Sequence, residues 1–247
     1  MSELNSNTEW KQWGRDDPLF GVASWKGKEK GGASPWTEDD FYSLGESDWR
    51  DFWAHWQQYG VNRSSCMEIG CGAGRITRQL AERFERVYAV DVSEDMIRCA
   101  RRAVNKNVEF SVIDGIHLPQ PDGSVKAIFS AHVMQHLDNV EIGYAYFREF
   151  FRVLDDGGTL MVHLPLYAFP GGQLEAMMRF LHRLSRLLGN IRAGVRRRSG
   201  IKTMRGTRYP IQALYDFLAS LGFKDIEIRI FPTKSNGELH PFVFAAK

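Results

Sequence analysis

A glycine-rich turn is the first segment of this sequence whose residue types and spacing could do chemistry. The segment MEIGCGAGRIT places Glu68, Gly70, Gly72 and Gly74 between a short apolar run and an amphipathic stretch. Glycines between a strand and a helix allow a tight turn and a close approach of the backbone to a ligand. Dinucleotide-binding proteins use G-x-G-x-x-G, but here the third glycine comes one residue early and Arg75 replaces the expected glycine. No Lys-Ser/Thr pair follows, which excludes a phosphate-binding P-loop.

Two further carboxylates close the apolar runs that follow this turn. Asp91 ends the second run, 17 residues after Gly74, where a carboxylate can accept hydrogen bonds from both hydroxyls of a ribose. Asp114 follows the third run in the segment FSVIDG, where it could accept a hydrogen bond from an adenine amino group. Glu68 lowers the electrostatic potential near the turn, so the site favours a cationic sulfonium over a pyrophosphate.

Together these segments resemble the successive cofactor motifs of the class I S-adenosylmethionine-dependent methyltransferases, and in particular their small-molecule type (methyltransferase-11/25-like). The resemblance rests on EIGCGAG, VDVS and the Asp-Gly pair after FSVI, and it covers about residues 48–165 and 210–247. It implies that the cofactor is S-adenosyl-L-methionine and that the product is S-adenosyl-L-homocysteine. The cofactor-binding residues that it implies are Glu68, Gly70, Cys71, Gly72, Gly74, Arg75, Asp91, Val92, Met96, Asp114, Gly115 and Ile116.

Within this set, the resemblance assigns Glu68 and the glycines to the methionine part of the cofactor and Asp91 to its ribose. It places Asp114 and Ile116 near the adenine, with Met96 packed in the same pocket. Two alternatives stay open, a nicotinamide-binding domain and a relic of the fold that binds no ligand. The glycine spacing fits the dinucleotide pattern poorly, which argues against the first of these.

Apolar runs that alternate with amphipathic stretches predict an α/β fold with a doubly wound, mostly parallel sheet. A loop too short for a crossover helix joins the last two runs, so the last strand should run antiparallel. The resemblance likewise implies a seven-stranded Rossmann-like sheet with an antiparallel last strand. The expected strands span residues 66–69, 86–90, 108–113, 125–129, 159–164, 223–230 and 242–246. The expected helices span residues 48–59, 76–84, 94–104, 140–154, 173–188 and 211–221.

The chain divides into two expected regions, an N-terminal aromatic-rich cap over residues 1–47 and a methyltransferase domain over residues 48–247. The cap shows no clear periodicity, so we expect an irregular segment, although its aromatic residues are too many for a disordered tail. The first helix of the domain would have Ser47 or Asp48 as its N-cap. Residues 166–209 interrupt the alternation, and we expect them to form an inserted helical lid.

Candidate catalytic residues follow the fourth predicted strand, in the segment SAHVMQHLD. His132 and His136 are four residues apart, so a helix would carry both on one face. Either could serve as the general base for a hydroxyl acceptor. His136 also matches a family position where histidine often has a structural role, and this alternative stays open. Further candidates for the acceptor site are Trp25, Trp36, Tyr42, His163, Arg205 and His240. For the aromatic candidates, ordinary core packing is the competing interpretation.

The expected lid is strongly basic. Between Ala176 and Tyr215 the chain has ten Arg and Lys and no Asp or Glu, although the whole chain carries a net charge of only +2. Three interpretations stay open: a lid that binds an anionic acceptor, a basic helix on an anionic membrane surface, and a solvated face without a partner. Nucleic acid is disfavoured as a partner, because the stretch lacks interleaved aromatic residues and no RNA-binding module is visible.

The cysteines and the N-terminal segment bear on the cellular compartment. Cys66, Cys71 and Cys99 show no zinc-type spacing, and an odd, scattered set suits a reducing cytoplasm. The sequence lacks both a signal-peptide pattern and an apolar run long enough for a transmembrane helix. We therefore expect a cytoplasmic monomer or homodimer without a metal site, although Asp138 and Glu141 leave a magnesium-assisted mechanism open.

The sequence thus predicts transfer of a methyl group from S-adenosylmethionine to a small molecule, with O-methylation of a sugar-like or other secondary metabolite as the first hypothesis. The alternatives are a lipid-like or anionic acceptor at a membrane surface, methylation of RNA or protein, and a non-catalytic adenosyl-binding regulatory protein. The intact glycine turn and the three acidic positions argue against a non-catalytic protein.

Overall fold

A computed structural model describes residues 4–104, 106–168 and 206–247. The described strands are β1 (Cys66–Ile69), β2 (Val87–Asp91), β3 (Val108–Val112), β4 (Val125–Ser130), β5 (Leu154–His163), β6 (Leu166–Tyr167), β7 (Tyr209–Pro210), β8 (Lys224–Pro232) and β9 (Leu239–Ala246). The described helices are α1 (Asn5–Asp16), α2 (Pro18–Val22), α3 (Glu38–Tyr59), α4 (Thr77–Arg83), α5 (Glu94–Ala103), the 3₁₀ helix η1 (Met134–His136), α6 (Val140–Val153) and α8 (Ile211–Leu221).

The main sheet has seven strands in the order β3-β2-β1-β4-β5-β9-β8. Strands β1 to β5 run parallel, whereas β9 is antiparallel to both of its neighbours, β5 and β8. The order reverses between β1 and β4, which is where open α/β sheets bind their ligands. The predicted doubly wound sheet with an antiparallel last strand is therefore confirmed.

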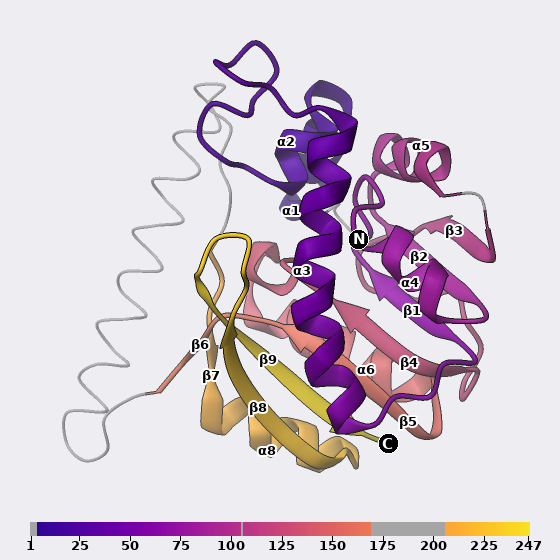
Figure 1. Cartoon of the computed structure of the whole chain (residues 1–247). Coiled ribbons are helices and arrows are strands. Elements are labelled where there is room, and N and C mark those ends of the chain that lie inside the picture. The colour runs from indigo at the N-terminus through magenta and orange to yellow at the C-terminus, as the bar shows by residue number, and fades with distance from the viewer. Residues whose placement is uncertain (1–3, 105, 169–205) are drawn as a thin grey trace.

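Helices cover both faces of this sheet (Figure 1). The long helix α3 lies along one face together with α4 and α5, while α6 and α8 cover the other face. Trp49, Phe52 and Trp56 of α3 pack on Phe129 of β4, and all four side chains are buried. Because parallel strands are buried on both faces, they read as nearly continuous apolar runs, and every residue of β1 is buried.

The N-terminal region differs from its prediction. It is not irregular, because α1 and α2 occupy most of its first 22 residues. Helix α3 begins at Glu38, so the predicted start near residue 48 was wrong by ten residues. The side chain of Thr37 accepts a hydrogen bond from Asp40 N at 3.1 Å and caps this helix. Three acidic residues in the first turn favour the same start through the helix dipole. The helix crosses the expected boundary at residue 47 without a break.

Most of the later boundaries agree with the predictions. The bounds of β1 and α8 were predicted to the residue, and Ser93 caps α5 by accepting a hydrogen bond from Met96 N. Strand β5 differs, because it begins at Leu154 directly after α6 rather than at Thr159 beyond a turn. The helix expected over residues 173–188 lies outside the described residues, as do most of the expected lid and Arg205.

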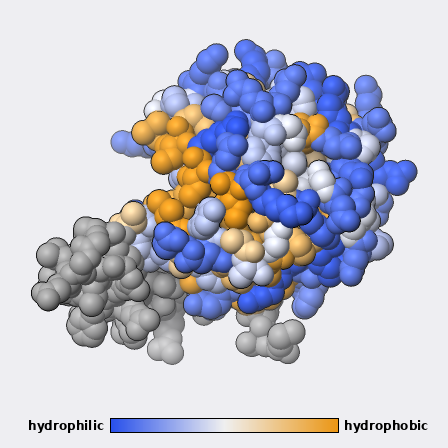
Figure 2. Space-filling view, turned by 90° about the horizontal axis from the view of Figure 1, so that it is seen from below, coloured by the Kyte–Doolittle hydropathy of each residue, from blue (hydrophilic) through white to orange (hydrophobic). Residues whose placement is uncertain are grey.

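Figure 2 views the molecule from below and shows apolar side chains gathered in a band on a mostly polar face. In the edge strand β8 and its neighbour β9, Ile230 and Leu239 are 59% and 67% exposed. Among the described residues, each helix is either too short or too polar to cross a lipid bilayer.

Candidate functional site

A cavity lies at the carboxyl ends of β1, β2 and β4, and α1 covers it. About 720 Å³ of space, including the part open to solvent, lies between its walls. Its lining residues come from segments far apart in the sequence: Ser6, Asn7, Trp10, Val22, Gly70, Gly72, Arg75, Asp91, Val92, Ile113, Ala131, His132, Val133, His136, Leu137 and Tyr146. We call this space the donor cavity.

The glycine-rich turn forms one wall of the donor cavity. Gly70 and Gly72 have φ angles of 72° and 52°, a region that favours glycine. A Cβ atom at Gly70 would overlap the side chain of Val133, and one at Gly72 would lie 2.6 Å from Cγ2 of Val22. The turn is therefore packed tightly between the segments after β4 and α2, with its backbone at the cavity wall.

Asp91 ties this turn to the end of β2. One of its carboxylate oxygens accepts a hydrogen bond from Gly72 N and the other from Ser93 N, both at 2.9 Å. Burial raises the pKa of Asp91 to about 6, although these backbone hydrogen bonds oppose the shift. A carboxylate has about four acceptor positions, so two remain for hydroxyl groups of a ligand in the cavity.

Glu68 lies on β1 beneath the turn and does not line the cavity. The hydroxyl of Thr77 donates to its Oε2 at 2.6 Å. Burial raises the pKa of Glu68 to about 7, and the Thr77 hydrogen bond and the charge of Arg75 oppose this rise. Arg75 does line the cavity, but its guanidinium forms a buried ion pair with Asp48 of α3. This ion pair joins the glycine-rich turn to α3.

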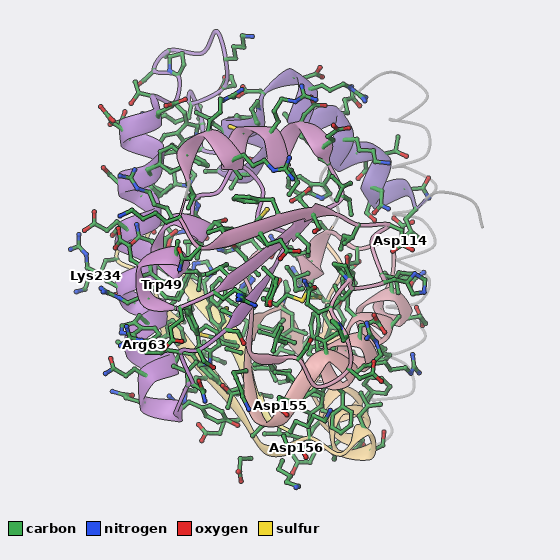
Figure 3. The ribbon with its side chains drawn as sticks, turned by 90° about the vertical axis from the view of Figure 1, so that its right-hand side faces the viewer. Trp49, Arg63, Asp114, Asp155, Asp156 and Lys234 are labelled. Atoms are coloured by element: carbon green, nitrogen blue, oxygen red, sulfur yellow. The ribbon has the colours of Figure 1, made fainter. Side chains whose placement is uncertain are left out.

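Apart from Val92, which lines the donor cavity, the other residues of the expected cofactor set do not line it. The carboxylate of Asp114 accepts hydrogen bonds from the backbone N–H groups of Ile116 and His117 and contacts the His117 ring at 2.6 Å. It is 56% exposed and lies at the periphery of the fold (Figure 3). The structure therefore does not bring this carboxylate to the cavity, and the adenine role stays a prediction. The remaining residues outside the lining are Cys71, Gly74, Met96, Gly115 and Ile116.

Helix α1 contributes lining residues that the sequence did not reveal. Its first turn is held by Asp138, whose carboxylate accepts hydrogen bonds from Asn5 N and Ser6 N at 2.9 Å. Farther along, Nδ2 of Asn7 donates to the backbone oxygen of Asp114 at 2.6 Å. These partners lie more than 100 residues apart in the chain, so no local pattern could have predicted them.

A second cavity adjoins the first and shares Trp10, Val22, Arg75, His132 and His136 with it. About 1320 Å³ of space, open solvent included, lies between its walls. It extends to the ends of β5 and β9 and to the turn between β8 and β9. Its further polar lining residues include Ser24, Asp48, Gln135, His163, Arg208, Thr233, Ser235, Asn236, Glu238 and His240. We call this space the acceptor cavity.

His132 and His136 lie at the junction of the two cavities, but not on one helical face as predicted. His132 has a φ of 60°, and only Met134–His136 form a short 3₁₀ turn. Residues from the described range 206–247 hold this turn in place. Thr207 N donates to Gln135 O at 2.7 Å, and the Tyr209 hydroxyl donates to Met134 O at 3.0 Å.

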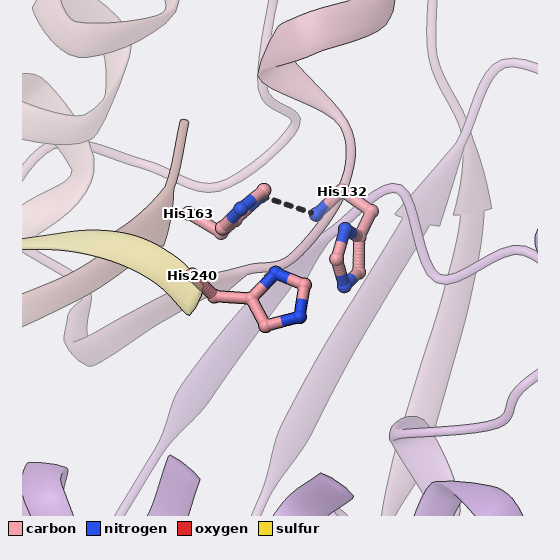
Figure 4. A group of neighbouring side chains, drawn as sticks. All are labelled: His132, His163 and His240. Carbon is pink, nitrogen blue, oxygen red and sulfur yellow. Dashed lines mark hydrogen bonds between the residues drawn. The ribbon is translucent and has the colours of Figure 1, made fainter. Parts of the chain in front are cut away.

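Three histidines come together in the acceptor cavity (Figure 4). His132 follows β4, His163 ends β5 and His240 lies near the start of β9, and their ring nitrogens lie within 4.8 Å of one another. The backbone N–H of His132 donates to Nδ1 of His163 at 3.3 Å. Burial lowers the pKa of His163 to about 3 and holds that of His132 well below its usual value, so both rings are neutral near pH 7.

The aromatic candidates for the acceptor site separate in the structure. Trp25 lines the acceptor cavity. Trp36 packs between α2 and α3, and its Nε1 donates to Ala23 O at 2.7 Å. The hydroxyl of buried Tyr42 donates to Ala73 O at 3.1 Å. The structure therefore brings only Trp25 of these three side chains to either cavity.

Comparison with known proteins agrees with this geometry. Residues 67–162 match a family model described as a methyltransferase domain. Ajmaline N-methyltransferase of Rauvolfia serpentina is 26% identical over 102 residues, which cover 39% of this chain and 34% of that protein. Methyltransferase cfoB of Aspergillus candidus is 30% identical over 187 residues, which cover 71% of this chain and 54% of that protein. The chain thus spans less than two thirds of these relatives.

The fold is shared with a solved enzyme structure. Magnesium protoporphyrin IX methyltransferase of Synechocystis PCC 6803, with bound S-adenosylhomocysteine, superimposes with a TM-score of 0.60 at 16% identity. The superposition covers 98% of this chain and all of that one. The family match over β1 to β5, the glycine-rich turn and the sheet order together support a class I methyltransferase, a family whose methyl donor is S-adenosylmethionine.

Proposed function

We propose that this protein transfers the methyl group of S-adenosylmethionine to a hydroxyl oxygen of a polar small molecule. The observation that carries the proposal is the pair of joined cavities. The donor cavity is walled by the glycine-rich turn and Asp91, and it meets the larger acceptor cavity at His132 and His136. A cofactor held in the first cavity can thus present its methyl group to a molecule held in the second.

The donor cavity suits the parts of this cofactor. We assign the ribose hydroxyls to Asp91, whose carboxylate retains acceptor positions beyond its two backbone hydrogen bonds. We assign the methionine part to the wall formed by Gly70 and Gly72. Asp91 lines the cavity and Glu68 is buried beneath the turn, whereas the one arginine there is already paired to Asp48. The charge of Asp91 and Glu68 favours a cationic sulfonium.

His136 is the general base in this proposal. It lines both cavities, and its ring lies 5.1 Å from that of Trp10. The acceptor O–H gives its proton to His136, and the oxygen attacks the methyl carbon. The C–S bond breaks, and its electrons stay on sulfur to give S-adenosylhomocysteine. Methyl transfer depends mainly on alignment of these atoms, since the sulfonium is already activated.

The lining of the acceptor cavity supports a hydroxyl-rich acceptor, such as a sugar-like molecule. Its lining includes Thr233, Ser235 and Asn236 from the turn between β8 and β9, together with Arg208. Thr233, Ser235 and Asn236 are linked to one another by hydrogen bonds, and hydroxyl and amide groups of this kind can also exchange hydrogen bonds with the hydroxyl groups of an acceptor.

Calorimetric titration with S-adenosylmethionine, with NAD as the control ligand, tests the donor half of the proposal. We expect the protein to bind S-adenosylmethionine and not NAD. The affinity should fall roughly tenfold to a hundredfold in Asp91→Ala, because hydrogen bonds to a charged group are worth about 1.5–3 kcal/mol. Absence of S-adenosylmethionine binding, or binding of NAD instead, would refute it.

Single-turnover methyl transfer to a panel of sugars and phenols tests the acceptor half. We expect His136→Ala to slow the chemical step by roughly 10²–10⁴-fold, the usual contribution of a general base. The matched control is His117→Ala, which removes an exposed histidine that lines neither cavity. Equal rates in His136→Ala and the wild type would overturn the assignment of the base.

A further inference from the structure

We propose that His132, His163 and His240 bind a divalent transition-metal ion, of which zinc is the best match, with its open coordination positions toward the acceptor cavity. Metal binding follows from the geometry of these three residues and does not depend on the proposed function. Only the role of the ion in acceptor binding rests on that function.

The three histidines lie on separate elements, and the strand order and register of the sheet bring their rings together. His163 ends β5 opposite Phe242 of the antiparallel β9, so His240 lies just beyond it along the same ladder. His132 enters from the turn after β4, the neighbour of β5 on its other side. The ring centroids lie 4.5 Å apart for His132 and His163, 5.1 Å for His132 and His240, and 5.3 Å for His163 and His240.

This spacing is close to that of a metal site. At Zn–N bonds of about 2.0–2.1 Å, tetrahedral ligand nitrogens lie about 3.3 Å apart. The ring nitrogens here lie within 4.8 Å of one another, so small side-chain rotations bring them to bonding distance. His132 N donates weakly, at 3.3 Å, to Nδ1 of His163, and this hydrogen bond can open without loss of a ladder hydrogen bond. Three imidazoles so close together repel one another when charged, and neutral imidazole is the form that binds metal.

A buried carboxylate beside the cluster provides an independent indication. Asp48 lines the same cavity as the three histidines and is 5% exposed. Its Oδ2 pairs with Arg75, but its Oδ1 is buried and has no hydrogen-bond partner among the described residues. An unsatisfied buried acceptor costs about 1–3 kcal/mol. A metal-bound water or a ligating imidazole N–H would satisfy it, since carboxylates commonly orient metal ligands in this way.

The charge of Arg75 is offset by Asp48, so the ion pair leaves little net positive charge against a bound cation. The donor set also selects the metal. Imidazole nitrogen suits zinc, copper, nickel and iron, whereas magnesium prefers oxygen ligands. The magnesium alternative drawn from Asp138 and Glu141 is disfavoured, because the Asp138 carboxylate accepts the first N–H groups of α1.

Three protein ligands leave at least one coordination position, as in catalytic zinc sites. An acceptor hydroxyl bound there loses its proton more readily, because the cation stabilises the alkoxide. The proton passes to His136, and the oxygen attacks the methyl carbon while the ion keeps its oxidation state. The site thus favours acceptors whose reacting hydroxyl has a second oxygen beside it to chelate the metal.

Metal titration of the untagged, chelator-treated full chain tests the proposal. Zn²⁺ is titrated against a chromophoric chelator, and Co²⁺ is followed by its visible absorption bands, both without cofactor or acceptor. We expect one ion per chain, a tetrahedral Co²⁺ spectrum, and affinities lowered at least tenfold in His163→Ala and in His240→Ala. Two controls, His136→Ala beside the cluster and His117→Ala far from it, should bind as the wild type does.

Binding of S-adenosylmethionine by the same variants shows whether they are folded, since His163 and His240 line only the acceptor cavity. The proposal is overturned if neither ion binds at micromolar concentration, or if both His163→Ala and His240→Ala bind as tightly as the wild type. If the wild type binds zinc but not S-adenosylmethionine, the proposed function is refuted and the metal site is retained. If it binds S-adenosylmethionine but not zinc, only the metal site is refuted.

Discussion

Glu68 lies beneath the glycine-rich turn, and its pKa is raised. The substitution Glu68→Gln tests how the negative charge of this side chain affects stability and cofactor binding. Burial raises the pKa of this carboxyl from 4.5 to about 7. Its Oε2 accepts a hydrogen bond from Thr77 at 2.6 Å, and the amide oxygen of the variant can accept the same bond. The substitution therefore removes the charge and the titration while it keeps the size and the main contact of the side chain.

The direction of the effect follows from the two pKa values. Between pH 4.5 and 7 the folded protein keeps a proton on Glu68 that the unfolded chain releases, so the free energy of unfolding falls as the pH rises through this window. The Glu68→Gln variant does not show this fall in the free energy of unfolding. Its stability relative to the wild type should rise from about 1 kcal/mol at pH 5 to about 3 kcal/mol at pH 8, given these pKa values. Asp91 has a pKa of about 6 and titrates in both proteins, so its contribution to the difference in the free energy of unfolding largely cancels.

Urea unfolding at half-unit steps from pH 5 to pH 8, followed by tryptophan fluorescence, measures this difference. The matched control is Glu82→Gln, the same substitution at an exposed glutamate on α4. A wild-type minus Glu68→Gln difference that is equal at pH 5 and pH 8 would show that Glu68 titrates normally in the folded protein, and the reasoning from burial would fail.

The same titration connects to cofactor binding. A bound sulfonium favours ionised Glu68, so wild-type affinity for S-adenosylmethionine should fall as the pH drops below 7, approaching tenfold per pH unit. Affinity of Glu68→Gln should be lower at pH 8 and should lack the part of this dependence that comes from Glu68, while the part due to Asp91 remains in both proteins. Calorimetry at pH 6 and pH 8 measures both, and parallel pH profiles for the two proteins would contradict the proposed contact between charge and cofactor.

Three further changes test the packing around the cavities. Gly70→Ala requires a strained φ of 72° and overlaps Val133, so we expect more than tenfold weaker S-adenosylmethionine binding in calorimetry; wild-type affinity would contradict this. Asp138→Asn weakens the cap on α1 by about 1 kcal/mol, and we expect faster cofactor dissociation in stopped-flow experiments; an unchanged rate would mean that α1 does not control release. Gly143→Ala overlaps the Tyr209 hydroxyl, so thermal unfolding should show a loss of about 1–3 kcal/mol, and an unchanged Tm would refute the contact.

The parts of the fold that were predicted well are those specified by local sequence. The segment CMEI is apolar enough for a strand buried on both faces, and the glycines that follow it are required by positive φ angles. Ser93 caps α5 through a hydrogen bond three residues away. The antiparallel end of the sheet followed from the length of one connection. Each of these signals lies within a window of about ten residues, which is the range over which propensity and spacing are informative.

The parts that the sequence did not reveal depend on distant contacts. Helix α1 is polar and contains Gly14, which weakens its pattern, but the missing side chain lets the helix approach Ser93. Its N-terminal cap comes from Asp138, far along the chain. The histidine cluster is likewise non-local, because His163 and His240 meet only through the register of β5 and β9. The three histidines are far apart along the chain, so no short zinc-type spacing marks them.

The contacts of α1 explain why the donor cavity is covered without being sealed. The helix is held at three points, by Asp138 after η1, by the backbone of Asp114 after β3, and by the close approach of Gly14 to Ser93 after β2. All three partners lie beyond the carboxyl ends of strands, in the same segments that wall the cavity. On the proposed function, a cofactor that orders those segments also orders the contacts that hold α1. The acceptor cavity extends instead to the turn between β8 and β9, so the donor and the acceptor meet at one junction from cavities with largely different walls.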